Sequence, residues 1–179
     1  MSVFSSIQRN INLYKGDCNM PHKVFVSYHH YNDQRQADYL RYYYGINNTL
    51  IDRSLPEALD SEDDDYILSV IRTKHLRDST VTIVLIGSET YKRKWVDWEI
   101  YSSLRPYKDR KRNGLLGIYL PSATFTPARL EDNIKSGYAV TMRWENISWQ
   151  LESKIEEAFK NREKDYLVIN SRPRKMRNG

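Results

Sequence analysis

The sequence has almost no cysteine and no long apolar run, so it lacks the features of disulfide-rich, cysteine-metal and membrane-spanning proteins. It contains a single cysteine, Cys18, so no disulfide can form within the chain and no cysteine-based metal cluster can assemble. No apolar run approaches the roughly 18 to 20 residues that cross a bilayer, and the first residues lack the basic and apolar regions of a secretory signal. These absences exclude disulfide-stapled and membrane-spanning classes and predict a cytoplasmic protein.

Glycine-rich phosphate-binding motifs are also missing. Neither G-x-G-x-x-G nor a Walker pattern occurs, which disfavours a Rossmann oxidoreductase and a P-loop NTPase. A phosphate receiver would need an Asp after the third strand, where this chain has Ile86-Gly87-Ser88. His29 and His30 are adjacent, with no further ligand at a metal-binding spacing on a helix, so a structural or capping role is favoured over a metal site.

The length of 179 residues fits one domain with flanking segments, and 40% hydrophobic residues are enough to bury a core. We expect an N-terminal arm over residues 1–21, the domain over residues 22–165, and a C-terminal segment with a basic tail over residues 166–179. The tail has no apolar periodicity, so its deletion is expected to leave the fold intact.

The net charge of +5 is unevenly distributed along the chain. Residues 1–91 hold 9 basic and 12 acidic residues, whereas residues 92–179 hold 19 basic and 11 acidic ones. Such asymmetry can mark a nucleic-acid face. Here the basic residues form short clusters without interleaved aromatic side chains, so the pattern favours a solvated surface or a protein contact over nucleic-acid binding.

Apolar runs rich in β-branched residues alternate with segments of helical periodicity. The strongest run, residues 79–86, has no polar alternation beyond Thr82, which predicts a central strand covered on both faces. Strands are expected at residues 23–28, 49–51, 79–86, 115–120 and 138–143, and helices at residues 33–44, from a cap at Ser61 to about residue 75, and at 95–104, 128–136 and 148–161. Residues 166–169 are expected to add an edge strand or to pack down. The alternation predicts an α/β, flavodoxin-like doubly wound sheet of about five mostly parallel strands with helices on both faces.

Ligands of such folds bind beyond the carboxyl ends of the strands, which here are residues 27–33, 52–54 and 87–95. The helix after the third of these segments carries Trp95 and Glu99 on one face, at i and i+4. A solvated Glu99 in a salt bridge would need Lys or Arg three or four positions away, and those positions hold Trp95, Val96, Ser102 and Ser103. The spacing therefore favours a site carboxylate.

Three ordered segments, KVFVSYHHYND, LIDRSLPE and TVTIVLIGSETYKRKWVDWEI, resemble the TIR-like family over roughly residues 22–150. The similarity is to the branch found as the TIR-like subunit of bacterial Thoeris anti-phage systems. Residues 24–33 are similar to the TIR strand-and-loop motif V-F-I-S-Y-S-x-x-D, and residues 95–99 to the helix motif W-C-x-x-E. The chain departs from the family pattern in the His29-His30 pair and in Val96, which replaces the Cys.

This resemblance implies an enzyme that takes NAD+ as its substrate, without another cofactor, and cleaves the bond between nicotinamide and ribose. It implies that Glu99 is catalytic and that an ADP-ribose-derived, cyclic product diffuses to and activates a separate effector. Self-association into a homo-oligomer is compatible with the family. The substrate-binding residues expected at the strand ends are Ser27, Tyr28, His30, Asp33, Asp52, Ser54, Gly87 and Trp95. Trp98 is a further candidate for a ring face, and for Trp95 and Trp98 core packing is an equal alternative. A non-catalytic TIR adaptor that acts through protein contacts is the competing interpretation.

Overall fold

The apolar run at the centre of the sequence forms the middle of a parallel sheet. The computed structural model describes residues 22–45 and 63–179. Within these residues the sheet has four parallel strands in the order β1 (Val24–Ser27), β2 (Val81–Ile86), β3 (Gly114–Tyr119) and β4 (Val140–Arg143). All six residues of β2 are buried, as expected for a central strand. The strand predicted at residues 49–51 lies outside the described residues.

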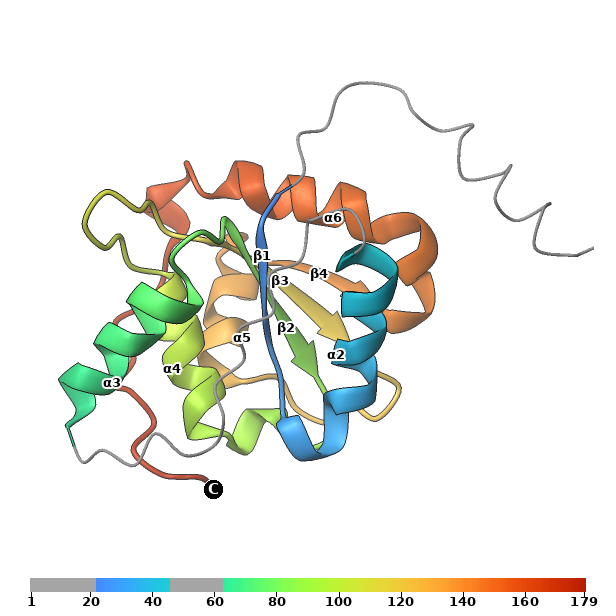
Figure 1. Cartoon of the computed structure of the whole chain (residues 1–179), viewed down its shortest axis with the longest axis horizontal. Coiled ribbons are helices and arrows are strands. Elements are labelled where there is room, and N and C mark those ends of the chain that lie inside the picture. Colours follow the sequence, from blue (N-terminus) through green and yellow to red (C-terminus); the bar gives the residue numbers. More distant parts are fainter. Residues whose placement is uncertain (1–21, 46–62) are drawn as a thin grey trace, which may run out of the picture.

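Helices lie between the strands in the sequence, as parallel strand pairing requires. They are α2 (His30–Gly45), α3 (Asp64–Val70) continued by the π-helical turn η2 (Ile71–His75), α4 (Lys94–Ser103), α5 (Ala128–Lys135) and α6 (Ile147–Asn161), with short 3-10 turns η3 (Thr90–Lys92), η4 (Trp144–Asn146) and η5 (Asp165–Leu167). Figure 1 shows α2 and α6 apart from α3, α4 and α5, with the sheet between the two groups. In the described part of the chain, no helix is long and apolar enough to cross a membrane.

The alternation of side chains along β2 divides the core into two layers. Val81, Ile83 and Leu85 pack with α2 and α6, whereas Val84 and Ile86 pack with α4 and α5. Successive side chains of a strand point to opposite faces, so a strand with apolar residues throughout must be covered on both sides. The doubly wound α/β fold predicted from the sequence is therefore confirmed.

Two helix starts differ from the prediction. α2 begins at His30, not at Asp33, so the loop after β1 is shorter than predicted. His30 and Asp33 both lie in the first turn of the helix. The cap of α3 is Asp63, whose carboxylate accepts from the backbone N–H groups of Asp65 and Tyr66. An Asp at this position satisfies two of the donors that every helix start leaves open.

The C-terminal segment is docked onto the domain, although its basic tail has no apolar periodicity. Residues 166–169 form no strand; Leu167 and Val168 pack against the core instead. Beyond them, Arg172 forms an ion pair with Asp132 at 2.8 Å, and the backbone N–H of Lys175 donates to Asp97 at 2.8 Å. Beyond residue 169 the sequence gives no apolar signal for docking, because backbone atoms and polar side chains make these contacts.

Candidate functional site

The carboxylate singled out in the sequence lies against the end of the first strand. Glu99 is in the second turn of α4 and is 4% exposed. Ser27, the last residue of β1, donates a hydrogen bond from Oγ to Oε2 of Glu99 at 2.5 Å. Ser27 alternates with Tyr28 and lies on the same side of β1 as Phe25, whose ring packs with α3 and α4. The strand and the helix thus fix this carboxylate at the carboxyl edge of the sheet.

A second buried carboxylate joins α2 to the end of β2. Asp33 is 2% exposed, and its Oδ2 accepts a hydrogen bond from Thr90 Oγ1 at 3.2 Å. The same Thr90 hydroxyl accepts from the backbone N–H of Gly87 at 2.9 Å. Burial raises the pKa of Asp33 above its usual value, although the hydrogen bond from Thr90 and a backbone hydrogen bond with His29 oppose that rise.

Gly87 is placed where a larger residue would collide with this carboxylate. A Cβ atom at Gly87 would lie 2.4 Å from Asp33 Oδ1 and 2.5 Å from Oδ2. The predicted site residues Asp33 and Gly87 are therefore neighbours. Thr90, which holds them together, was missed by sequence reasoning. Its position three residues after the glycine was the available signal, because Thr side chains often hydrogen-bond backbone groups a few residues away.

Two predicted site residues lie with α2 and not with Glu99. The Tyr28 ring is 4% exposed and belongs to the core shared with α2 and α6. It stacks on the ring of His30 with the centroids 4.5 Å apart. Its hydroxyl donates to Gln34 at 2.9 Å and accepts from Arg41 at 2.8 Å. Tyr28 and His30 thus form a packed group at the start of α2, on the other side of β1 from Ser27.

Trp95 is partly buried on α4, where its ring meets that of Trp98 edge-on at 5.6 Å. Both rings belong to the cluster formed by Phe25 and the residues of α3. Trp95 therefore has a packing role whether or not it contacts a ligand. The remaining two predicted residues, Asp52 and Ser54, lie outside the described part of the chain.

In the described residues, Glu99 and Asp33 do not belong to a metal centre. Within residues 22–45 and 63–179, no three His, Cys, Asp or Glu side chains are arranged to hold a metal ion. Of the two adjacent histidines, His29 contacts the guanidinium of Arg93, and His30 stacks on Tyr28. The histidine pair is thus tied into the start of α2 by neighbouring side chains.

An open pocket of about 660 Å³ lies elsewhere on the carboxyl edge, at the ends of β3 and β4. Arg143, Glu145, Asn146 and Gln150 supply its polar lining. None of the predicted site residues lines it, and β2 separates β3 from the strand that carries Ser27. The candidate site is therefore the pair of Glu99 and Ser27. The size of a pocket does not by itself indicate a reaction.

Comparison with known proteins agrees with these features. The family model described as "Thoeris protein ThsB, TIR-like domain" matches residues 25–124, which include most of β1, all of α4 and the Ser27–Glu99 pair. The TIR domains in the solved structure of the activated Roq1 resistosome, described as directly recognizing the pathogen effector XopQ, share 8% sequence identity over 83% of this chain and 85% of that chain, with a TM-score of 0.39. No curated protein matches the sequence. The fold assignment rests on the strand order and the helix layers described above.

Proposed function

Because the chain belongs to the family of TIR-like domains of Thoeris protein ThsB, we propose that it cleaves the nicotinamide–ribose bond of NAD+. The product in this proposal is derived from ADP-ribose, is cyclic, and activates a separate effector protein in anti-phage defence. The observation that carries the proposal is the buried Glu99 carboxylate, held by Ser27 at the carboxyl edge of the sheet. Parallel α/β folds bind their ligands at this edge.

One carboxylate is sufficient for the bond cleavage. The electron pair of the C1′–N bond passes to the cationic nicotinamide nitrogen, which leaves as a neutral pyridine and needs no general acid. Positive charge then develops on the ribose ring, as it does in glycoside hydrolysis. The ribose carbon finally accepts a bond from water or from a nucleophilic atom of the same ADP-ribose, and this nucleophile loses a proton. Glu99 is assigned the stabilisation of the oxocarbenium-like transition state.

The surroundings of Glu99 suit this role in two respects. At 4% exposure the carboxylate is shielded from water, and charges interact more strongly where water is excluded. The hydrogen bond from Ser27 sets the orientation of one carboxylate oxygen before substrate arrives. A preoriented charge spends little free energy on reorganisation when the transition state forms.

The decisive experiment measures nicotinamide release from NAD+ by wild-type protein and by Glu99→Gln. The amide preserves the shape of the side chain and removes its charge, so turnover should fall by at least about 10²-fold, or about 2.7 kcal/mol of barrier. Glu152→Gln is the matched control, because it makes the same change at an exposed position of α6 and should leave turnover unaltered. Each protein is assayed with and without filtrate of phage-infected cells, since the family resemblance implies activation by infection.

The same variants separate catalysis from a role as an adaptor. An adaptor that acts only through protein contacts would still protect cells from phage after Glu99→Gln, whereas an enzyme would lose protection together with nicotinamide release. Mass analysis of the small molecules in the reaction distinguishes a cyclic product from ADP-ribose. Near-normal product formation by a well-folded Glu99→Gln protein would refute the assignment of Glu99.

A further inference from the structure

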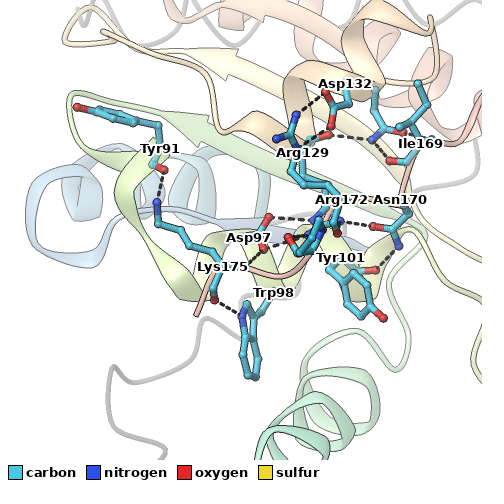
Figure 2. Close-up of polar contacts among 12 residues, drawn as sticks. Tyr91, Asp97, Trp98, Tyr101, Arg129, Asp132, Ile169, Asn170, Arg172 and Lys175 are labelled. Atoms are coloured by element: carbon cyan, nitrogen blue, oxygen red, sulfur yellow. Dashed lines mark hydrogen bonds and ion pairs between the residues drawn. The ribbon is translucent and has the colours of Figure 1, made fainter. Parts of the chain in front are cut away.

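The C-terminal strap, which we define as residues 169–179, crosses the outer side of α4 (Figure 2). It follows η5, passes Arg129 of α5, and ends at the beginning of α4. α4 is the helix that carries Glu99. The contacts between the strap and this helix therefore bear on the position of the proposed catalytic carboxylate.

The first group of contacts is centred on Arg129, whose side chain is fully buried. A guanidinium has five N–H donors, and here each of them has an acceptor. Nε and Nη2 donate to the Asp97 carboxylate of α4 at 2.9 and 3.2 Å. The other three bonds go to the strap, namely to Asn170 Oδ1 at 2.8 Å, Arg172 O at 2.9 Å and Pro173 O at 3.0 Å. Arg129 thus links α4 to the strap through one buried cation.

The second group of contacts is made by the backbone of Lys175. Its N–H donates to Asp97 Oδ2 at 2.8 Å, and its carbonyl accepts from Trp98 Nε1 at 2.7 Å. The guanidinium of Arg174 lies 4.9 Å from the centre of the Trp98 ring. The strap thereby covers the polar edge of a tryptophan whose body is buried in the core with Phe25.

The third group of contacts caps the start of α4. The helix begins after Arg93, which makes no side-chain capping hydrogen bond. Asn178 Oδ1 accepts from the backbone N–H of Lys94 at 2.9 Å, and the N–H of Gly179 donates to the carbonyl of Lys92 at 3.1 Å. An Asn side chain commonly satisfies the open N–H groups of a helix start from the residue just before the helix. Here the capping side chain is that of Asn178, 84 positions away in the sequence.

Asp97 and Glu99 are two residues apart and so project from nearly opposite sides of α4. Asp97 is held by Arg129 and the strap, while Glu99 is held by Ser27 of β1. We infer that the C-terminal strap is a positioning element. Its contacts with the outer side of α4 hold the helix where the Glu99 carboxylate can accept the hydrogen bond from Ser27. The catalytic consequence of this inference rests on the proposed NAD+ cleavage.

The test compares two substitutions at Lys175 in the full-length protein. Lys175→Pro removes the N–H that donates to Asp97 and keeps the carbonyl that accepts from Trp98. Lys175→Ala keeps both backbone bonds and removes only the side chain, whose Nζ lies 3.5 Å from Tyr91 O. A second pair uses the cap: Asn178→Ala removes the acceptor for Lys94, whereas Asn178→Asp retains it.

Two measurements are made on each variant, well below its melting temperature. Lys175→Pro and Asn178→Ala should speed the hydrogen exchange of the α4 amides and lower kcat for nicotinamide release by about tenfold or more, with KM nearly unchanged. Lys175→Ala and Asn178→Asp should resemble wild type in both measurements. A strap that only adds stability would change the melting temperature and leave kcat intact, and that result would overturn the inference.

A third measurement tests the role of the strap independently of the proposed reaction. The carboxyl 13C resonance of Glu99, assigned by its loss in Glu99→Gln, reports the surroundings of the carboxylate without any substrate. It should shift in Lys175→Pro and stay in place in Lys175→Ala. If wild-type protein released no nicotinamide, the proposed reaction would fail while a shifted resonance would still support the strap. An unchanged resonance together with unchanged exchange in α4 would refute the strap in either case.

Discussion

Ser27 Oγ lies 2.5 Å from Glu99 Oε2, and this buried hydrogen bond joins residues 72 positions apart in the sequence. The donor ends β1, and the acceptor lies in the helix that follows β2. Both residues are buried, so a carboxylate that turned away from the serine would have to displace neighbouring atoms. The bond therefore fixes the direction of the carboxylate that we assign to NAD+ cleavage.

Replacing Ser27 by Ala should weaken catalysis less than replacing Glu99 by Gln. The negative charge stays in place, but the hydrogen bond that orients it is lost. Hydrogen bonds to charged groups contribute about 1.5–3 kcal/mol, so we expect kcat for nicotinamide release to fall by about 10- to 10²-fold. Ser27→Thr keeps the hydroxyl and is the control. Wild-type kcat in Ser27→Ala, alongside an inactive Glu99→Gln, would mean that the hydroxyl does not orient the carboxylate.

Gly87→Ala should destabilise the fold because the new methyl group would collide with Asp33. The Cβ would lie 2.4 Å from a carboxylate oxygen that is itself buried. Forcing an extra methyl group into a packed interior costs about 1–3 kcal/mol, and chemical denaturation measures this loss. Asp33→Ala removes the colliding oxygens, so Gly87→Ala should cost less in that background than in wild type. Equal costs in both backgrounds would show that the clash is relieved elsewhere.

The sheet and its two covering layers could be predicted because they depend on local hydrophobic pattern. The run at residues 81–86 has apolar residues on both faces, which requires cover on both sides, and the structure places α2 with α6 on one face and α4 with α5 on the other. The same alternation, read from the sequence, predicts that two of the expected site residues lie on opposite faces of the sheet. Ser27 and Tyr28 are neighbours at the end of one strand, so they point to opposite faces.

The C-terminal strap could not be predicted from the pattern of its residues. Its docking uses backbone N–H and carbonyl groups, which every sequence offers, and a buried Arg129 that nothing local distinguishes from a solvated arginine. The partner of Arg129, Asp97, is 32 positions away and on another helix. Contacts of this kind depend on the tertiary structure as a whole, so the lack of apolar periodicity in the segment gives no sign of them. Whether the tail is dispensable for folding stays a prediction.

The pH dependence of stability should change when Asp33 is replaced by Asn. Burial raises the folded-state pKa of Asp33 above 3.8, so the folded protein binds more protons than the unfolded chain in the range just above that value. The contribution of this group to stability is therefore present below the unfolded pKa and is lost as the pH rises through the folded pKa. Asn stays neutral and retains an oxygen that accepts from Thr90. Relative to wild type, Asp33→Asn should gain stability as the pH rises from about 4 to about 7. Denaturation at several pH values checks this, and a relative stability that falls over the same range would contradict it.

Ile83→Ala tests the central place of β2. Ile83 is fully buried, pairs with Val26 of β1 and Leu116 of β3, and packs in the core on the α2 and α6 face. Truncation at such a position leaves a cavity and should cost about 2–5 kcal/mol of the free energy of unfolding. Leu85→Ala, two residues along the same face, should cost a similar amount. The free energy of unfolding is measured by urea denaturation. A nearly neutral effect of either change would contradict the central, buried position of β2.

The buried pair of Asp97 and Arg129 should show strong coupling in a double-mutant cycle. Asp97→Ala leaves a fully buried guanidinium without its counter-charge, and breaking a buried pair in this way costs about 3–5 kcal/mol. Removing Arg129 as well removes the uncompensated charge, so the double variant should be less destabilised than the sum of the two single variants. The exposed pair of Glu131 and Lys135 on α5 is the control, and its coupling should stay within about 0.5 kcal/mol because water screens it. If the two cycles gave equal coupling energies, the Asp97–Arg129 ion pair would contribute no more than an exposed pair, and the strap would hold α4 mainly through its other contacts, with Asp97, Trp98, Lys94 and Tyr101.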